Sequence, residues 1–91
     1  MVNEELAAAV AEADAWVMPP LLFKALRGLV VERIASELPL KDLLAFQRRG
    51  VNVRVDEFLP DNLVALLRGV EVIGTLRFDK GNVELVKFKK D

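Results

Sequence analysis

The chain has 91 residues, which is enough for one domain with a single modest core and too short for two domains. It contains no cysteine and no histidine, so disulfides and metal sites built on these residues are excluded. Thirteen basic and 14 acidic side chains give a formal charge of −1, which excludes a strongly basic coat protein for nucleic acids. Ser36 and Thr75 are the only hydroxyl residues, and neither has a histidine base to activate it for nucleophilic catalysis.

Apolar residues are more frequent than a domain of this size needs. They make up 53% of the chain. With glycine included the share rises to about 58%, against about 45–50% in an average soluble domain. A small domain has proportionally more surface to cover with polar groups, so the surplus predicts exposed apolar patches and a binding partner. The scarcity of amide and hydroxyl side chains beside 30% charged residues resembles the composition of thermophile proteins.

The N-terminal part of the sequence lacks the pattern of a membrane or secretion segment. The uncharged stretch at residues 15–23 is interrupted by Pro19 and Pro20 and is much shorter than the roughly 18 residues of a spanning helix. The first basic residue is Lys24, so the positive start of a signal peptide is missing. We therefore expect a cytoplasmic protein without membrane contact.

Residues 3–18 are expected to form an acidic N-terminal helix. Glu4 and Glu5 place negative charge in the first turn, where the helix dipole favours it. Pro19 and Pro20 end the pattern, because the residue before a proline is pushed out of the α conformation. Four apolar residues recur at helical spacing: Leu6, Val10, Ala13 and Val17.

A second helix is predicted at residues 20–38. Its apolar residues cover about half of the helix circumference, by the 3.6-residue repeat, and this is wider than a helix covered on one side requires. We therefore expect it to be the central helix, contacted from two directions. The apolar residues are Leu22, Phe23, Leu26, Leu29, Val30, Val31, Ile34 and Leu38.

Two shorter helices are expected after it. Residues 40–49 form the third, which Gly50 closes at the position where a glycine commonly ends a helix. Residues 60–68 form the fourth, with a proline at its start and Gly69 as its stop. Its buried side is expected to consist of Leu63, Leu66 and Leu67.

Strands are expected at residues 51–55, where valines alternate with polar residues, and in a C-terminal hairpin. The hairpin turn falls at residues 79–82, with Lys80 and Gly81 as a two-residue loop. The apolar face changes side after Leu85, which predicts a strong twist or a bulge near Gly74. The expected pairs are Phe78–Val83, Leu76–Leu85, Ile73–Phe88, Arg77–Glu84 and Glu71–Lys90.

Together these elements predict an α+β fold, with three or four helices packed on a small antiparallel sheet that ends in the C-terminal hairpin. Residues 1–91 are expected to form a single domain. Within it, residues 1–18 are the N-terminal helix, 19–69 a helical core and 70–91 the hairpin. The element order is also compatible with a winged-helix arrangement, in which residues 60–68 form the recognition helix.

The favoured function is a non-enzymatic protein–protein interaction module that self-associates into a homodimer. The apolar surplus motivates this prediction, and large aromatic side chains dominate the energetics of interfaces. Trp16, Phe46 and Phe88 are the candidate residues for anchoring a partner. No cofactor or metal is expected.

The alternative is a nucleic-acid-binding protein of the winged-helix type. Phosphate contacts need several basic side chains on one surface. Charge is segregated along the chain: residues 1–18 carry −4 and residues 19–54 carry +4. The candidate contacts are Arg48, Arg49, Arg54, Arg77, Lys80, Lys87, Lys89 and Lys90.

Three acidic residues, Asp56, Glu57 and Asp61, surround the expected start of the fourth helix. Such a cluster could hold a hard cation such as Mg²⁺. Acidic residues are also common at helix starts, where they cap the helix and favour its dipole, and this second interpretation is preferred.

Overall fold

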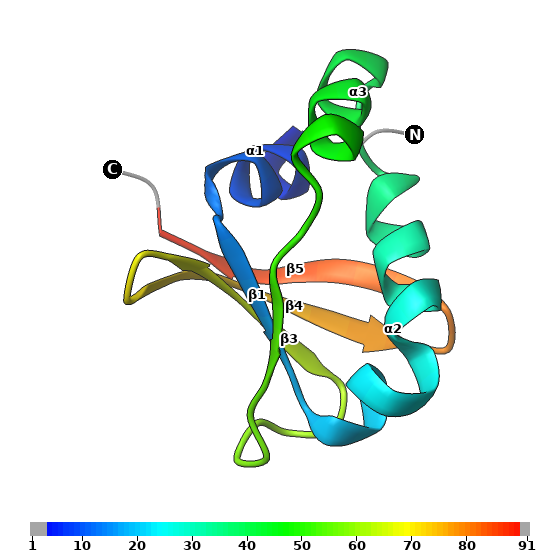
Figure 1. The fold of residues 1–91 in the computed structure, drawn as a ribbon, viewed down its shortest axis with the longest axis vertical. Helices are drawn as coiled ribbons and strands as arrows, with labels where there is room; N and C mark the ends of the chain where they lie inside the picture. The colour runs from blue at the N-terminus through cyan, green and yellow to red at the C-terminus, as the bar shows by residue number, and fades with distance from the viewer. Residues whose placement is uncertain (1–3, 90–91) are drawn as a thin grey trace.

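The computed structural model describes residues 4–89, which form three helices and five strands (Figure 1). The protein therefore has an α+β fold, as the sequence predicts. The helices are α1 (Glu4–Glu12), α2 (Pro20–Ala35) and α3 (Leu40–Arg49). The strands are β1 (Ala15–Met18), β2 (Val53–Val55), β3 (Leu63–Arg68), β4 (Glu71–Asp79) and β5 (Asn82–Phe88).

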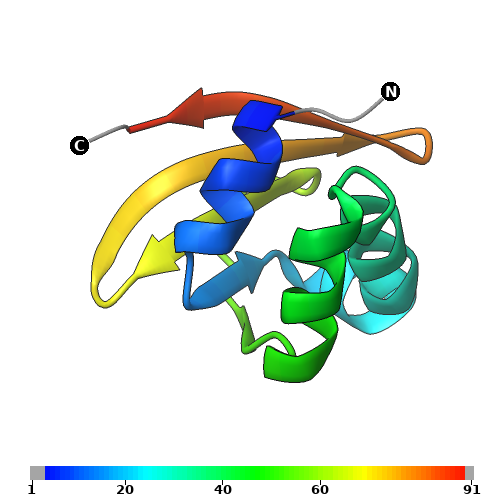
Figure 2. The ribbon, with the colours of Figure 1, turned by 90° about the horizontal axis from the view of Figure 1, so that it is seen from above.

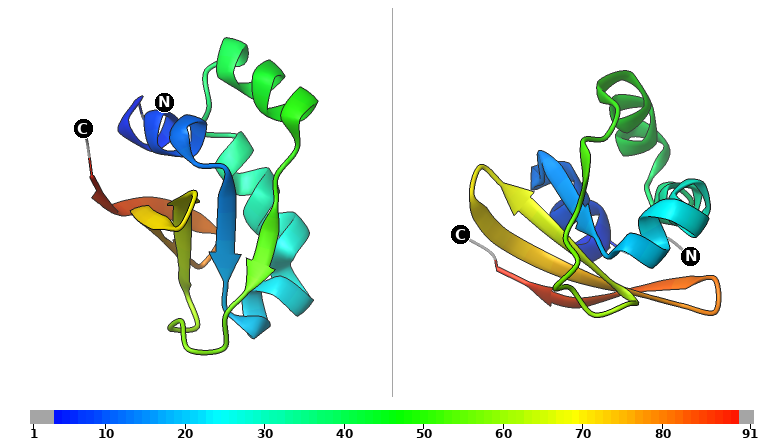
Figure 3. Two further views of the ribbon diagram at one scale, coloured as in Figure 1. Left: turned by 60° about the vertical axis from the view of Figure 1, so that its left-hand side comes forward. Right: turned by 60° about the horizontal axis from the view of Figure 1, so that its bottom comes forward.

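All five strands belong to one sheet with the order β2-β1-β3-β4-β5. Strands β1 and β2 are parallel and the other neighbours are antiparallel, so the sheet is mixed rather than wholly antiparallel. The sheet curves, and the three helices lie together on its concave side (Figures 2 and 3). Strands β2 and β5 are the two edges of the sheet.

The core fills the space between the concave face of the sheet and the helices. Helix α1 contributes Leu6 and Val10, and helix α2 contributes Ile34. Strands β1 and β3 contribute Trp16 and Leu66, which are direct neighbours across the two strands. These side chains come from separate parts of the chain, so the core joins elements that are distant in sequence.

Gly74 in β4 allows helix α1 to approach the sheet closely. A Cβ atom at this position would lie 3.2 Å from the carbonyl oxygen of Lys87 and 3.8 Å from the Cβ of Ala9. A larger side chain would therefore push against both the neighbouring strand and the helix.

The prediction of one helix over residues 3–18 is wrong at its C-terminal end, because α1 stops at Glu12 and the chain enters strand β1. Strand β1 lies between β2 and β3, so its backbone bonds on both sides. Asp14 fixes the entry, since its N–H donates to the carbonyl oxygen of Leu67 and its carboxylate accepts from Gly69 N–H. Here pairing with distant strands overrides the local helical spacing.

The fourth predicted helix is also wrong, because residues 63–68 form strand β3. Its apolar run has no alternation, which suits a strand enclosed between two neighbours as well as it suits a helix. Gly69, with φ of +66°, starts the tight turn into β4 instead of ending a helix. The predicted recognition helix of a winged-helix fold is therefore absent at residues 60–68, and residues 19–69 are not a purely helical core.

Helix α2 is less central than predicted. It ends at Ala35, and among its residues only Leu22, Val30 and Ile34 are fully buried. Leu29 is 42% exposed, so the wide apolar arc is covered from one side and not from two. Among residues 4–89, no helix is both long and apolar enough to span a membrane.

Other elements lie where the sequence places them. Helix α3 has the predicted bounds, and Gly50 follows it with φ of +74°. Both Lys80 and Gly81 have positive φ, which defines the predicted two-residue hairpin loop. Three predicted cross-strand pairs are confirmed: Phe78–Val83, Leu76–Leu85 and Arg77–Glu84.

The predicted irregularity near Gly74 is confirmed and shifts the end of the hairpin by one residue. Leu76 pairs with Leu85 and Thr75 with Lys87, so Val86 is an extra residue in β5. The predicted pair Ile73–Phe88 is therefore wrong, and Phe88 pairs with Gly74. The predicted pair Glu71–Lys90 cannot be followed, because Lys90 lies outside the described residues. Lys89 makes the ion pair with Glu71, at 3.1 Å between Nζ and Oε2.

Candidate interaction surfaces

Two of the three predicted aromatic anchors belong to the core. The side chain of Trp16 is 1% exposed and stacks on Phe46, with 5.6 Å between the ring centroids. Phe46 is also buried, and Phe88 is half-buried against the core. Because both rings are almost completely buried, the assignment of Trp16 and Phe46 as exposed anchors for a partner is corrected: they hold α3 against β1.

The predicted basic residues do not gather on one surface. Arg54 lies in β2, whereas Lys87 lies in β5, at the opposite edge of the sheet, and Lys89 follows the end of β5. Four strand spacings separate these edges, about 19 Å along the sheet. Arg77 forms an ion pair with Glu84, and Lys80 lies in the hairpin turn. The described basic residues therefore form no continuous track for a phosphate backbone.

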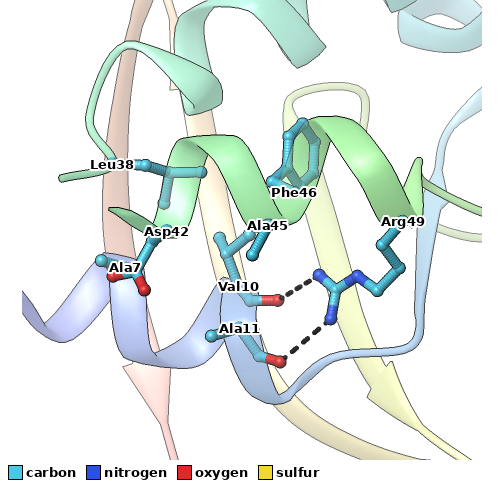
Figure 4. Close-up of a pocket in the computed structure, with 8 residues that line it drawn as sticks. All are labelled: Ala7, Val10, Ala11, Leu38, Asp42, Ala45, Phe46 and Arg49. Carbon is cyan, nitrogen blue, oxygen red and sulfur yellow. Dashed lines mark hydrogen bonds between the residues drawn. The ribbon is translucent and has the colours of Figure 1, made fainter. Parts of the chain in front are cut away.

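Arg49 is engaged within the chain. Its two terminal nitrogens donate to the carbonyl oxygens of Val10 and Ala11, at 3.3 and 3.2 Å (Figure 4). These carbonyls belong to the last turn of α1, where a helix has unpaired acceptors and the negative end of its dipole. Arg49 thus closes helix α1 from helix α3 and ties the two helices together.

A hollow of about 160 Å³ lies between α1 and α3, beside Arg49. Its walls are mainly apolar, with the carboxylate of Asp42 and the guanidinium of Arg49 near its two ends (Figure 4). The residues that line it include no hydroxyl or amine nucleophile, so its chemistry suits occupation by a small apolar group. The residues are Ala7, Val10, Ala11, Leu38, Asp42, Ala45, Phe46 and Arg49.

The acidic residues near position 60 have a local structural role. The carboxylate of Asp56 accepts a hydrogen bond from the N–H of Phe58 at 2.9 Å, which closes the turn after β2. No helix starts here, so the preferred interpretation as helix-start residues is wrong. Among the described residues, no group of three or more acidic side chains is arranged to hold a metal ion.

The predicted exposed apolar residues are present, and they lie in separate groups. One group surrounds the end of β2 at the bottom of the molecule in Figure 1, a second lies on α3, and a third lies in the β3–β4 hairpin, while Leu29 in α2 and Val86 in β5 stand apart from them. The largest single exposure of an aromatic ring is that of Phe58, at 88%. The exposed large apolar residues are Leu21, Leu29, Leu40, Leu44, Val55, Phe58, Val70, Val72 and Val86.

The β5 edge of the sheet carries features that oppose pairing with another strand. Val86 bulges out of the regular register, and Lys87 places a positive charge on the strand. Glu84 in the same strand is held in its ion pair with Arg77. Bulges and charged side chains are the usual means by which an edge strand avoids pairing with another molecule.

The β2 edge has no bulge and no lysine. It is regular over its three residues, it carries one charged side chain, Arg54, and Val55 is 46% exposed. Phe58 follows in the turn, and Leu21, 57% exposed, lies at the start of α2 at the same end of the molecule (Figures 1 and 3). We call Val53, Arg54, Val55, Asp56 and Phe58 the β2 surface.

Sequence reasoning missed the β2 surface as a candidate site. The valine alternation at 51–55 predicted the strand but not its position in the sheet. A strand at the edge has unpaired backbone groups on one side, whereas a strand in the middle is paired on both sides. The order of the strands depends on β1, which was predicted as helix. The only local signal was an aromatic residue, Phe58, within a turn of acidic and proline residues.

Comparison of the chain with known protein families, with characterised proteins and with solved structures finds no match. The functional argument therefore depends on the geometry of the surfaces described above.

Proposed function

We propose that this chain is a non-enzymatic protein–protein interaction module that self-associates into a homodimer. The observation that carries the proposal is the β2 surface, where a regular sheet edge lies next to exposed apolar side chains. Phe58 is 88% exposed, so covering its ring would remove a large apolar surface from water. Burying a large apolar side chain contributes about 1.5–3 kcal/mol, and a few such contacts support micromolar association.

The composition supports the same proposal. The core takes up most of the large apolar residues, yet nine of those in the described part of the chain remain exposed. Among them, Val55 and Phe58 form an exposed apolar group, and such groups commonly mark an interface. Val55 and Phe58 belong to one short segment of the chain, so a partner that covers the β2 edge also covers this group.

Binding to nucleic acid finds less support. The recognition helix of the winged-helix alternative is strand β3, and Arg49 and Arg77 are engaged by other groups of the chain. The other described candidates are divided among helix α3 (Arg48), the two sheet edges and the hairpin turn (Lys80). Salt-sensitive retention on heparin by a monomeric protein would favour this alternative over self-association.

Light scattering coupled to size-exclusion chromatography tests the proposed function. We expect a mass of two chains at high concentration, and a fall towards one chain on dilution through the micromolar range. Because burial of apolar surface is not screened by ions, raising the salt concentration should leave the dimer in place. A mass of one chain at every concentration would contradict the proposal.

A further inference from the structure

The hydrogen bonds of β2 show which of its backbone groups face away from the sheet. The N–H of Trp16 donates to the carbonyl oxygen of Asn52, and the N–H of Asp56 donates to that of Met18, each at 2.8–2.9 Å. Residues 52 and 56 therefore face β1. By the alternation of a strand, the N–H and C=O groups of Val53 and Val55 face outward, where the described chain gives them no backbone partner.

We propose that β2 pairs antiparallel with β2 of a second copy of this chain, across a twofold axis at Val55, to give one continuous ten-stranded sheet. This inference rests on the proposed self-association and names its interface. In an antiparallel pair two opposed residues exchange both backbone bonds, so Val55 of each copy bonds to Val55 of the other. Because the chain turns after Asp56, the pairing is confined to the short segment around Val55.

Charge complementarity selects this register. Arg54 and Asp56 alternate with the valines, so both side chains leave the same face of the strand. With the axis at Val55, Arg54 of each copy lies opposite Asp56 of the other, which makes two symmetric attractive pairs. With the axis at Arg54, the two arginines would face each other and repel. An isologous contact of this kind closes on itself and stops at two copies.

The exposed side chains fit the same arrangement. Phe58 lies in the turn directly after β2, so a partner strand at this edge ends beside it. Pairing therefore covers a ring that is 88% exposed in the single chain. The β5 edge offers no equivalent, since its bulge and Lys87 oppose pairing with a partner strand. The β2 edge is therefore the edge at which a second copy pairs.

Cysteine cross-linking tests the arrangement, because the natural chain contains no cysteine. We compare Val55→Cys with Val86→Cys, two valines of nearly equal exposure (46% and 51%) on the two sheet edges. Opposed residues in an antiparallel pair have Cα atoms about 5.5 Å apart, within the range that a disulfide spans. Under mild oxidation we expect Val55→Cys to cross-link about tenfold faster than Val86→Cys, because pairing holds the two thiols at high effective concentration.

The outcomes separate this inference from the proposed function. Rapid cross-linking of Val55→Cys supports both. A dimeric mass for the natural chain, with equal slow cross-linking of the two variants, overturns the β2 pairing and keeps self-association. A monomeric mass for the natural chain overturns both.

A charge reversal tests the register without a cysteine. Arg54→Glu turns two attractive pairs into two repulsive pairs, so the dissociation constant of the dimer should rise about tenfold. Adding Asp56→Asn removes the repulsion while its side-chain oxygen still accepts from Phe58 N–H, so part of the affinity should return. Arg48→Glu, the same change on helix α3, should leave the dissociation constant unchanged. Equal effects of Arg54→Glu and Arg48→Glu would overturn the register.

Discussion

The two edges of the sheet differ in how they meet solvent. Strand β5 is seven residues long and carries a bulge at Val86, one lysine (Lys87) and an ion pair that holds Glu84. Strand β2 has three residues, no bulge and an exposed valine, and is followed by an exposed phenylalanine. The longer edge, which is the greater hazard for uncontrolled pairing, is the protected one.

This difference indicates that the exposed β2 edge is a specific feature of the molecule. A short regular edge limits pairing to a few backbone bonds, so a partner must add side-chain contacts to hold there. Arg54, Asp56 and Phe58 supply a charge pattern and an apolar ring for such contacts. A protein with two unprotected edges would instead extend into fibres through heterologous contacts.

The largest expected effect comes from removing the support beneath the β2 edge. Trp16→Ala deletes the ring that pairs with Val53 in register and stacks on Phe46, and leaves a cavity in the core. We expect the free energy of unfolding to fall by about 3–5 kcal/mol in a urea titration. The matched control is Phe58→Ala, an aromatic residue 88% exposed, which should change the stability of the monomer by less than about 0.5 kcal/mol. Similar losses for both variants would contradict the assignment of core and surface.

An intermediate effect is expected where helix α3 leads into β2. Arg49→Met keeps much of the side-chain volume but removes the bonds to the carbonyl oxygens of Val10 and Ala11. We expect a loss of about 1–2 kcal/mol in the free energy of unfolding, since charge-assisted bonds at a helix C-terminus contribute this much. Arg48→Met is the control, because the structure gives the neighbouring Arg48 no hydrogen bond or ion pair. Equal stabilities of the two variants would show that Arg49 does not hold α1.

The smallest effect is expected at the end of the protected edge. Glu71→Gln removes the ion pair with Lys89. The side chains of Glu71 and Lys89 are both more than a third exposed. Exposed pairs contribute little, so thermal unfolding should report a loss of at most about 0.5 kcal/mol, and less at high salt. A loss above about 1 kcal/mol would mean that this pair is essential for the docking of β5 on β4.

The parts of the fold that depend on local signals could be predicted from the sequence. The bounds of α3 follow from Pro39 and Gly50, and the register of the hairpin follows from the Lys80–Gly81 loop and the opposed charges of Arg77 and Glu84. These signals act between residues that are close in the chain, so no knowledge of the rest of the fold is needed.

Strands β1 and β3 could not be predicted in the same way. The apolar residues of 15–18 and 63–68 fit helical spacing as well as a strand enclosed by neighbours. Only the pairing of Trp16 with Leu66, fifty residues apart, decides between them. The candidate site depends on the same pairing, because β2 becomes an edge only once β1 is a strand. This is why Val55 and Phe58 were missed and Trp16 was taken for a surface anchor.

Amide hydrogen exchange, measured residue by residue at several protein concentrations, tests most directly whether the two edges behave differently. If β2 pairs with a second copy, the outward N–H groups of Val53 and Val55 should exchange more slowly as the concentration rises. The outward N–H groups of Val83 and Leu85 in β5 should keep the same rate throughout. Slowing at β5 instead of β2, or no change at either edge, would contradict the account.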